Sequence, residues 1–197
     1  MANGFGRSNV WLIEKMDYYL RKDLEATDDE IDYLKRLCSI KTKDRGIPKK
    51  RPNNRLPSTI IDGFLYHGDI GHAKNLTLLN EIGVKHILNV CDIELDKEIN
   101  DNFNVLWINI NDEVSINIQD YFEKTNQFLH LCQNKGEKVL VHCQMGISRS
   151  SSIVLAYLIK YDKKNLLDAY DHLVTCRRIA SPNFGFFLQL IRYEKTL

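Results

Sequence analysis

The chain has 197 residues, of which 44% are hydrophobic and 27% charged, and its 27 basic and 26 acidic side chains leave a formal net charge of +1. This composition excludes a disordered, collagen-like or disulfide-stapled protein, and the length suits one domain with an appendage. The near-neutral charge gives no general attraction to nucleic acid or a membrane surface, and no apolar run approaches the roughly 20 residues that cross a bilayer. The first residues show neither a signal-peptide pattern nor a glycine at position 2, so neither export nor myristoylation is expected.

The first forty residues predict two helices. Apolar residues recur at helical spacing in the first segment: Trp11, Leu12, Met16, Tyr19 and Leu20. A second helix is predicted after Thr27, because Glu30 three positions later completes a capping box. Residues 41–55 then carry seven basic side chains and one acidic, with two prolines, which indicates a linker or an extended arm. Residues 1–57 are therefore predicted to form a helical extension and basic linker, with the helices packed on the domain that follows.

From residue 58 onward, short apolar runs alternate with helical stretches. The strand candidates are TIIDGFLYHG, KHILNV, VLWINI and KVLVHC. The helical candidates are AKNLTLLNEIG, IQDYFEKTNQFLHLC and three pieces at roughly 149–161, 163–177 and 183–195. Buried runs such as ILNV and VLVH are typical of parallel strands that are covered on both faces. The pattern predicts an α/β domain over residues 58–197, with a central, mostly parallel sheet of about five strands flanked by helices.

The chain contains five cysteines: Cys38, Cys91, Cys132, Cys143 and Cys176. Their odd number and the absence of CxxC spacing argue against a disulfide framework or a zinc site, and no metal or cofactor is expected. Reduced thiols of this kind predict a cytoplasmic or nuclear protein. Most free cysteines are small buried hydrophobic residues, so the question is whether one lies where a thiolate is stabilised.

One cysteine stands at the end of a predicted strand, in the stretch KVLVHCQMGISRSSS. The strand ends at His142, a loop follows, and a helix begins at about Arg149. At the carboxyl edge of such a sheet, loop amides and a helix N-terminus favour an anion, so Cys143 is predicted to be a reactive thiolate. The planar guanidinium of Arg149 can bond two phosphate oxygens at once. The predicted phosphate-binding residues are Gln144, Met145, Gly146, Ile147, Ser148 and Arg149.

This stretch resembles the HCxxGxxR[ST] signature of the cysteine-based protein phosphatases. The matching residues are His142, Cys143, Gly146, Arg149 and Ser150, with Ser148 giving the SRS form of many dual-specificity phosphatases. The resemblance covers residues 58–197, from GFLYHGDIGHAKNLTLLNEIGVKHILNV to SPNFGFFLQLIRYE. One departure is His67-Gly-Asp in place of the more usual Leu-Gly-Ser, and it is expected to affect surface chemistry more than mechanism.

The reaction that this resemblance implies needs an acid and then a base. When Cys143 attacks phosphorus, the leaving oxygen must be protonated, and a water must later be activated against the phosphocysteine. Members of the family keep an aspartate on a mobile loop about thirty residues before the nucleophile. Asp112, which lies 31 residues upstream of Cys143 in the loop INDEVSIN, is the predicted acid and base. Glu113 and Asp120 are the alternatives, and Asp120 is expected to cap or begin the following helix.

The resemblance also implies roles for two neighbours of the loop. Ser150 is expected to stabilise the cysteine thiolate as it departs in the second step, with a helix N-terminal serine as the alternative. His142 is expected to orient the loop and favour the Cys143 thiolate rather than to transfer a proton, with a purely structural role as the alternative.

The substrate class is predicted from what the loop lacks. Its interior, Gln-Met-Gly-Ile-Ser, has no lysine or histidine, whereas lipid-directed relatives resemble CKAGKGR. No Lys-Asn-Arg-Tyr-like segment of the kind that deepens a tyrosine-only pocket is present. The predicted function is a dual-specificity protein phosphatase that hydrolyses phosphotyrosine, phosphoserine and phosphothreonine through a phosphocysteine. The alternatives are a phosphatase for a phosphoinositide, RNA 5′ end or phosphoglucan, and a non-catalytic phosphoprotein-binding module.

Two further features bear on regulation and partners. Cys91 follows ILNV and is expected to be packed in the core, with a reversible disulfide to Cys143 as the alternative. The basic block near Lys49, Lys50, Arg51 and Arg55 faintly resembles a kinase-docking or nuclear-import segment, which would make a protein kinase a partner. A solvated linker is the stronger interpretation. Phosphorylated proteins are the expected partners, with no nucleic acid and no membrane insertion, and no oligomeric state is predicted.

Overall fold

The computed structural model describes residues 6–42, 55–162 and 165–197. The strands are β1 Ser58–Ile61, β2 Leu65–Gly68, β3 Val84–Asn89, β4 Asn104–Trp107 and β5 Lys138–His142. The helices are α1 Gly6–Lys22, α2 Asp28–Thr42, α3 Ile70–Ala73, α4 Leu76–Ile82, α5 Lys97–Asn102, α6 Phe122–Asn134, α7 Arg149–Tyr161, α8 Leu166–Cys176 and α9 Phe184–Glu194, with a 3₁₀ turn η1 at Gln119–Tyr121. None of the helices in these ranges is long and apolar enough to cross a membrane.

The five strands form one sheet in the order β1-β2-β5-β3-β4. The pairs β2–β5, β5–β3 and β3–β4 are parallel, while β1 runs antiparallel to β2. The predicted mostly parallel sheet is therefore confirmed. The run TIIDGFLYHG supplies two strands instead of one, because the chain turns at Gly63 with a φ of +68° that glycine adopts without strain.

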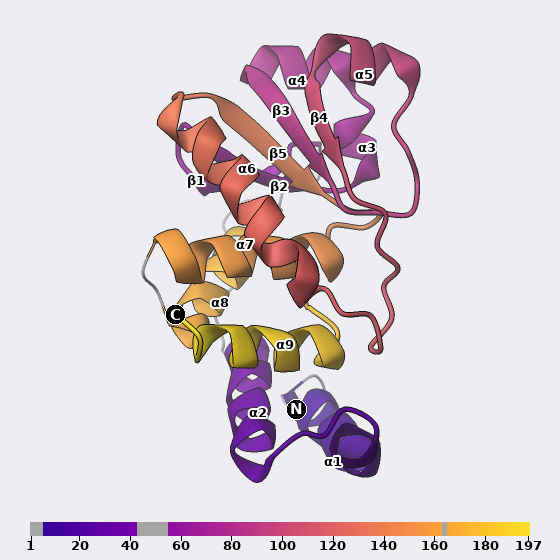
Figure 1. The fold of residues 1–197 in the computed structure, drawn as a ribbon, viewed down its shortest axis with the longest axis vertical. Helices are drawn as coiled ribbons and strands as arrows, with labels where there is room; N and C mark the ends of the chain where they lie inside the picture. Colours follow the sequence, from indigo (N-terminus) through magenta and orange to yellow (C-terminus); the bar gives the residue numbers. More distant parts are fainter. Residues whose placement is uncertain (1–5, 43–54, 163–164) are drawn as a thin grey trace, which may run out of the picture.

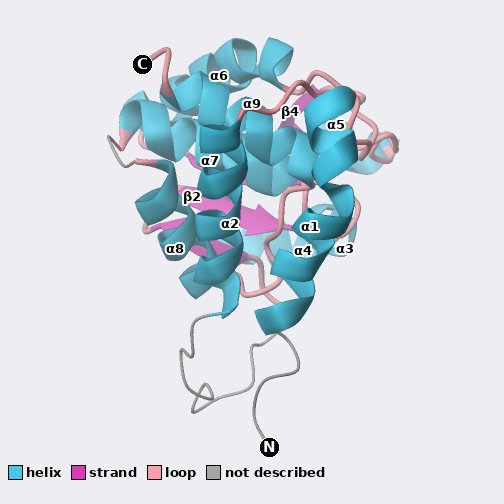
Figure 2. Cartoon of the chain, turned by 90° about the horizontal axis from the view of Figure 1, so that it is seen from below, coloured by secondary structure: helices cyan, strands magenta, loops and turns pink. Residues whose placement is uncertain are grey.

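Helices cover both faces of the sheet (Figure 1), and Figure 2 shows the strands enclosed between them. The side chains of β5 alternate accordingly. Val139 and Val141 belong to the large hydrophobic cluster that includes α7, α8 and α9, whereas Leu140 belongs to a smaller cluster beneath α3, α4 and α5. Burial on both faces explains why β5 is continuously apolar in sequence.

The N-terminal extension begins its second helix as predicted. The Thr27 amide donates to Glu30 Oε2 at 3.1 Å, and the Glu30 amide donates to Thr27 Oγ1 at 3.3 Å, which completes the capping box. Ile13 of α1 and Leu34 of α2 are fully buried and belong to the same hydrophobic cluster as α7 to α9. The predicted basic linker lies almost entirely at residues 43–54, outside the described residues, and the domain division at residue 57 stays a prediction.

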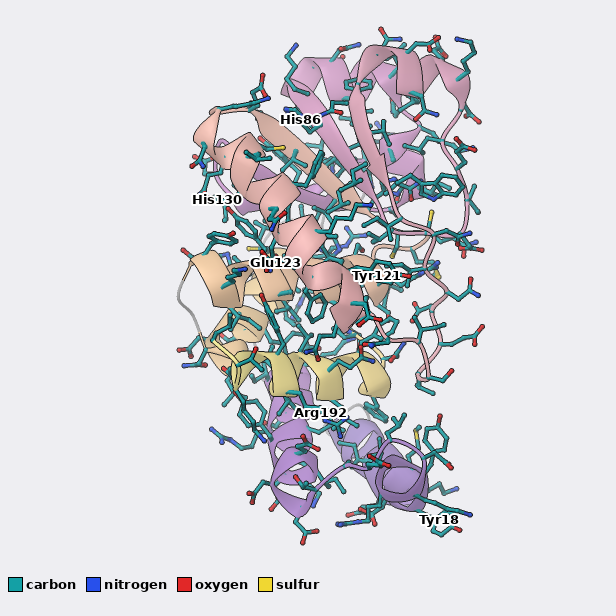
Figure 3. All side chains as sticks on the ribbon, viewed as in Figure 1. Tyr18, His86, Tyr121, Glu123, His130 and Arg192 are labelled. Carbon is teal, nitrogen blue, oxygen red and sulfur yellow. The ribbon has the colours of Figure 1, made fainter. Side chains whose placement is uncertain are left out.

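Arg192 of α9 joins the extension to the α/β domain, and Figure 3 labels it on the side of α9 that faces the N-terminal helices. Its Nε donates to Glu30 Oε1 at 3.0 Å, and its Nη2 donates to the carbonyls of Leu24 at 2.9 Å and Glu25 at 3.2 Å. These bonds close the turn between α1 and α2 onto α9.

Candidate active site

The loop after β5 has the predicted strand–loop–helix setting. β5 ends at His142, and α7 begins at Arg149. Cys143 lies in the core with 1% of its surface exposed. α7 points its N-terminus, with its partial positive charge, at the loop. The predicted nucleophile therefore stands where a negative charge is stabilised.

The carbonyl groups of residues 144–148 each accept a hydrogen bond from another part of the chain. The Gln144 carbonyl accepts from the Ile70 amide at 3.2 Å, and the Ile147 carbonyl accepts from the Ser181 amide at 2.7 Å. Arg177 donates from Nη2 to the Met145 carbonyl at 3.2 Å and from Nε to the Gly146 carbonyl at 2.8 Å. The Ser148 carbonyl accepts from the Ser152 amide at 2.9 Å.

The loop amides are left for a ligand. Among the described residues, the amide groups of residues 144–149 have no hydrogen-bond acceptor. Consecutive amides that share one concave side form an anion-binding site. The structure thus brings the predicted phosphate-binding residues into one cradle.

Gly146 gives the loop its curvature. It adopts a φ of +62°, and a Cβ at this position would lie 2.8 Å from the Gly68 carbonyl carbon and clash with the side chain of Arg177. Only glycine fits this conformation and this close approach to β2.

Arg149 is buried and partly committed to protein partners. Its Nη1 donates to Asp92 Oδ1 at 2.8 Å and to the Ile110 carbonyl at 3.0 Å. Its buried Nε has no hydrogen-bond partner among the described residues. Two fixed bonds on one side and an open donor on the other orient the guanidinium for an oxyanion. The hydrogen bond from Arg149 Nη1 also lowers the pKa of Asp92.

Ser150 contacts the predicted nucleophile directly. Its hydroxyl donates to Cys143 Sγ at 3.1 Å, and His67 Nε2 lies 2.8 Å from the same hydroxyl oxygen. The expectation that His67 affects surface chemistry is wrong, because this side chain is fully buried. β2 lies between β1 and β5, and His67 points with Leu65 to the face that α7 covers.

His142 packs beside the nucleophile with its backbone and ring fixed. Its Nδ1 lies 3.2 Å from the Cys143 carbonyl, and the ring is fully buried. Burial lowers the pKa of His142 to about 4. The contact of Nδ1 with the Cys143 carbonyl agrees with the expected role of His142 in orienting the loop, and a ring with this lowered pKa offers the thiolate no positive charge at pH 7.

Asp112 reaches the loop from the segment after β4. Its Oδ1 accepts from Ser148 Oγ at 2.6 Å and from Asn183 Nδ2 at 2.9 Å, and its Oδ2 lies 3.7 Å from Arg149 Nε. The alternative Asp120 lies in η1, where it accepts from Asn117 Nδ2 at 2.8 Å. The other alternative, Glu113, is exposed. Of the three carboxylates, Asp112 is the one bonded to the phosphate loop.

Sequence reasoning missed several residues that hold this site together: His67, Asp92, Arg177 and Asn183. Asp92 follows the carboxyl end of β3, so its position was a usable signal for a residue at the ligand-binding edge. Asn183 was visible only as part of the closing motif. Arg177 stands between α8 and α9, where nothing in the sequence indicates that its side chain turns back to the loop.

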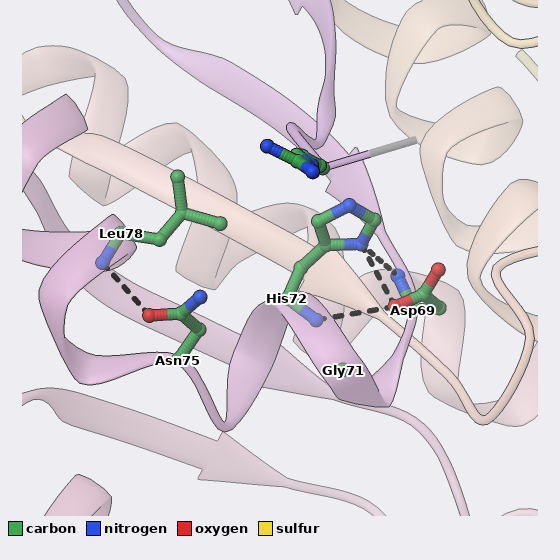
Figure 4. Close-up of a pocket in the computed structure, with 6 residues that line it drawn as sticks. Asp69, Gly71, His72, Asn75 and Leu78 are labelled. Atoms are coloured by element: carbon green, nitrogen blue, oxygen red, sulfur yellow. Dashed lines mark hydrogen bonds and ion pairs between the residues drawn. The ribbon is translucent and has the colours of Figure 1, made fainter. Parts of the chain in front are cut away.

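The turn at the start of α3 contacts Arg177. Asp69 and His72 cap α3 reciprocally, with the His72 amide donating to Asp69 Oδ1 at 3.1 Å and the Asp69 amide donating to His72 Nδ1 at 3.1 Å (Figure 4). Asp69 Oδ2 lies 3.7 Å from Arg177 Nη2. The capped turn thereby places a carboxylate beside the arginine that holds the loop.

Cys91 is buried near the same sheet edge. Its thiol donates to Asn89 Oδ1 at 3.0 Å and contacts the Ile93 carbonyl at 3.3 Å, and burial raises the pKa of Cys91. These bonds agree with the packing role, and the disulfide with Cys143 stays a prediction. No group of three or more histidine, cysteine or acidic side chains within the described ranges is arranged to hold a metal ion.

Comparison with known sequences gives consistent matches. A family model for the dual specificity phosphatase catalytic domain matches residues 65–196. Dual specificity protein phosphatase 1 of Arabidopsis thaliana is 37% identical over 178 residues, which are 90% of this chain and 85% of that protein. A probable rhodanese domain-containing dual specificity protein phosphatase of Dictyostelium discoideum is 39% identical over 141 residues, 72% of this chain and 29% of that protein. The chain spans about a third or less of the first curated relatives it matches.

Solved structures agree with the sequence comparisons. The human tyrosine phosphatase-like serine/threonine/tyrosine-interacting protein matches 72% of this chain and 97% of its own, with a TM-score of 0.67 and 31% identity. A mouse putative dual specificity phosphatase, complexed with zinc tungstate, matches 78% of this chain and 94% of its own, with a TM-score of 0.68 and 25% identity. These matches confirm the resemblance that the HCxxGxxRS loop predicts, and the chain belongs to the dual specificity phosphatase family of the cysteine-based phosphatases.

Proposed function

We propose that this protein is a dual-specificity phosphatase that hydrolyses phosphate esters on protein side chains through a phosphocysteine at Cys143. One observation carries the proposal. The loop carbonyls accept hydrogen bonds from the protein, whereas the loop amides and the buried Arg149 Nε have no acceptor among the described residues, so a phosphate dianion next to Cys143 can satisfy them.

In the first step, the Cys143 thiolate attacks phosphorus and the bond to the ester oxygen breaks. The loop amides and the Arg149 guanidinium stabilise the charge on the three non-bridging oxygens as the transition state forms. Asp112 donates a proton to the leaving oxygen. Because its Oδ1 already accepts from Ser148 and Asn183, Oδ2 is the oxygen that carries this proton.

In the second step, Asp112 accepts a proton from a water that attacks phosphorus, and the sulfur–phosphorus bond breaks. The electron pair returns to the Cys143 sulfur, and the Ser150 hydroxyl donates a hydrogen bond to the thiolate that forms. Inorganic phosphate then leaves. The two roles of Asp112 require it to stay beside the loop in both steps, which its bond to Ser148 supports.

The nucleophile is tested with a chromogenic aryl phosphate. We expect Cys143→Ser to lower the rate on the order of 10⁴-fold, because a serine hydroxyl in this site lacks an activating base. Cys176→Ser is the matched control, since Cys176 is a half-buried thiol near the end of α8, and it should keep wild-type activity. Turnover that survives Cys143→Ser, or its absence from the wild type, would contradict the proposal.

The substrate class is tested by phosphate release from three sets of esters: phosphotyrosine peptides, phosphoserine and phosphothreonine peptides, and phosphoinositides. The loop side chains offer no lysine or histidine for a multiply charged headgroup, so we expect both peptide classes to be hydrolysed faster than the lipids. A preference for phosphoinositides would assign the protein to non-protein esters. Tight peptide binding without Cys143-dependent release would instead make it a binding module.

A further inference from the structure

A fully buried histidine lies behind the serine that contacts the nucleophile. His67 Nε2 is 2.8 Å from Ser150 Oγ, and Ser150 Oγ is 3.1 Å from Cys143 Sγ. His67 comes from β2, Cys143 follows β5, and Ser150 lies in the first turn of α7, so three elements meet in one chain of contacts. His67 and Ser150 are both fully buried, so water does not compete for these hydrogen bonds.

The donors and acceptors among His67, Ser150 and Cys143 are fixed by the charge state of the Cys143 sulfur. A thiolate has no proton to give, so the Ser150 hydroxyl must donate to it. The oxygen of that hydroxyl then accepts from His67 Nε2–H. His67 Nδ1 has no hydrogen-bond partner among the described residues, which agrees with the tautomer that carries its proton on Nε2.

His67 is placed to donate this bond and not to store a proton. Burial, together with the positive charge of Arg177, lowers the pKa of His67 well below its ordinary value. The ring therefore stays neutral across the range in which a phosphatase works. A neutral Nε2–H donor gives the Ser150 oxygen one fixed partner. This bond disfavours the orientations of Ser150 in which its hydroxyl points away from the Cys143 sulfur.

We propose that His67 is a positioning residue that aims the Ser150 hydroxyl at Cys143 and thereby speeds the breakdown of the phosphocysteine. The proposal rests on the proposed function. When water attacks phosphorus, the sulfur–phosphorus bond breaks, its electron pair goes to Cys143 and the water proton goes to Asp112. A Ser150 hydroxyl that already points at the sulfur stabilises the negative charge that develops there, and it does not have to reorient during the step.

The two chemical steps can be separated by rapid mixing with an activated aryl phosphate. The burst of phenol reports attack by Cys143, and the later steady rate reports phosphocysteine breakdown when that step is slow. We expect His67→Leu to slow breakdown about tenfold, the effect of one charge-assisted hydrogen bond, while the burst rate changes less. His67→Gln should keep most of the rate, because the glutamine amide can donate from nearly the position of Nε2.

A double variant of His67 and Ser150 distinguishes an effect on the orientation of the Ser150 hydroxyl from a general structural effect of losing His67. In a Ser150→Ala background, His67→Leu should have no further effect on breakdown, because the hydroxyl that it aims is gone. His86→Leu is the control for loss of a buried strand histidine: His86 is 6% exposed on β3 and contacts Glu137 at 2.6 Å, away from the loop. It should change stability but not the ratio of the two step rates.

Two outcomes would overturn the inference. One is a His67→Leu enzyme with wild-type breakdown, and the other is an equal loss in the presence and absence of the Ser150 hydroxyl. Both require a wild type with Cys143-dependent turnover. A wild type without such turnover contradicts the proposed function itself.

Discussion

Gly146 is the residue on which the shape of the phosphate loop depends most directly. We expect Gly146→Ala to lower kcat/KM about 100-fold, because a methyl group meets the β2 backbone at Gly68 and strains a φ of +62°. β2 is bonded on both sides within the sheet, so the loop must move instead. The rate is measured with an aryl phosphate and compared with the thermal unfolding midpoint. A folded Gly146→Ala enzyme with full activity would contradict this account of the loop.

Asn183 lies in contact with the predicted acid and also caps α9. Its Oδ1 accepts from the Phe186 amide at 2.9 Å, and its Nδ2 donates to Asp112. Serine is an equally good helix cap but has no amide donor, so Asn183→Ser should keep stability and release Asp112. We expect the rate to fall about tenfold for a poor leaving group such as phenol and little for nitrophenol, which departs without an acid.

The comparison of leaving groups supplies its own control. Asp112→Asn should show the same selectivity with a larger loss, about 100-fold or more for the poor leaving group. Equal losses for both leaving groups in Asn183→Ser would indicate a damaged loop instead of a released acid.

At the level of single residues, the sequence predicts the groups that carry a local signature. Cys143, Arg149 and Ser150 belong to one short motif, and Asp112 is found by its distance along the chain from Cys143. His67 and Arg177 could not be found this way. Their roles arise when β2 and the α8–α9 connection fold against the loop, and a contact between residues 31 positions apart, such as Arg177 with Gly146, leaves no local pattern.

At the scale of elements, the N-terminus of α9 determines where the acid loop lies. A Cβ on Gly185 would lie 2.7 Å from the Val114 carbonyl carbon, two residues beyond Asp112. We expect Gly185→Ala to push this segment away from the phosphate loop and to lower the rate at least about tenfold for poor leaving groups. The loss is measured, as for Asn183→Ser, by comparing the rates for esters of phenol and of nitrophenol.

A control separates this effect from loss of the helix. Helix propensity favours alanine over glycine, so α9 itself should not be weakened by the change. Full activity of Gly185→Ala with phenyl phosphate would show that the acid loop has room that the structure does not give it.

Elements with clear local signals are predicted well, and those defined by packing are not. The Thr27–Glu30 capping box predicts the start of α2, and the apolar run before His142 predicts β5. The short α5 was not predicted, because in KEINDN only Ile99 is buried and no helical period can be seen. Its helix depends on the contact of Ile99 with the small cluster beneath the sheet.

At the scale of the whole molecule, the position of the extension depends on contacts between residues far apart in the chain. Glu30 and Arg192 are separated by 162 positions, and Tyr33 donates to Glu194 at 2.8 Å across 161. The sequence predicts that the two helices pack on the domain but not that α9 receives them. No pattern within either segment identifies the partner.

The Arg192 contacts predict how much the extension stabilises the protein. We expect Arg192→Met to lower the free energy of unfolding by about 2 kcal/mol, because buried Glu30 loses its nearest charged partner, keeping only Lys195 at 4.0 Å, and two carbonyls lose a donor. Urea unfolding measures the change. The steady-state rate of folded Arg192→Met should match the wild type, since Arg192 lies near the end of α9 opposite to Asn183. An unchanged unfolding midpoint would mean that these bonds add nothing to docking of the extension.

Buried neutral histidines make the stability of the whole molecule depend on pH. Burial holds the pKa of His142 at about 4 in the folded protein, below the ordinary value near 6.5 that it regains on unfolding. Below pH 6.5, His142 is therefore protonated in the unfolded chain but stays neutral in the folded protein. Its contribution to the free energy of unfolding is complete above pH 6.5 and decreases as the pH falls toward 4. His67, whose pKa is also lowered by burial, acts in the same direction.

The expected loss for His142 is about 3 kcal/mol between pH 7 and pH 4, measured by urea unfolding at intervals of half a pH unit. His142→Asn isolates it, since asparagine does not titrate and its amide can still donate to the Cys143 carbonyl from near the position of Nδ1. Carboxylates such as Glu30, whose pKa is lowered on folding because the bonds from Arg192 and Thr27 outweigh burial, act only near and below pH 4.5 and affect both proteins equally. The variant should therefore lose less stability than the wild type between pH 6.5 and 5. If the free energies of unfolding of the two proteins fall in parallel over that interval, His142 is protonated without unfolding, and the core around the phosphate loop accommodates a charged imidazole.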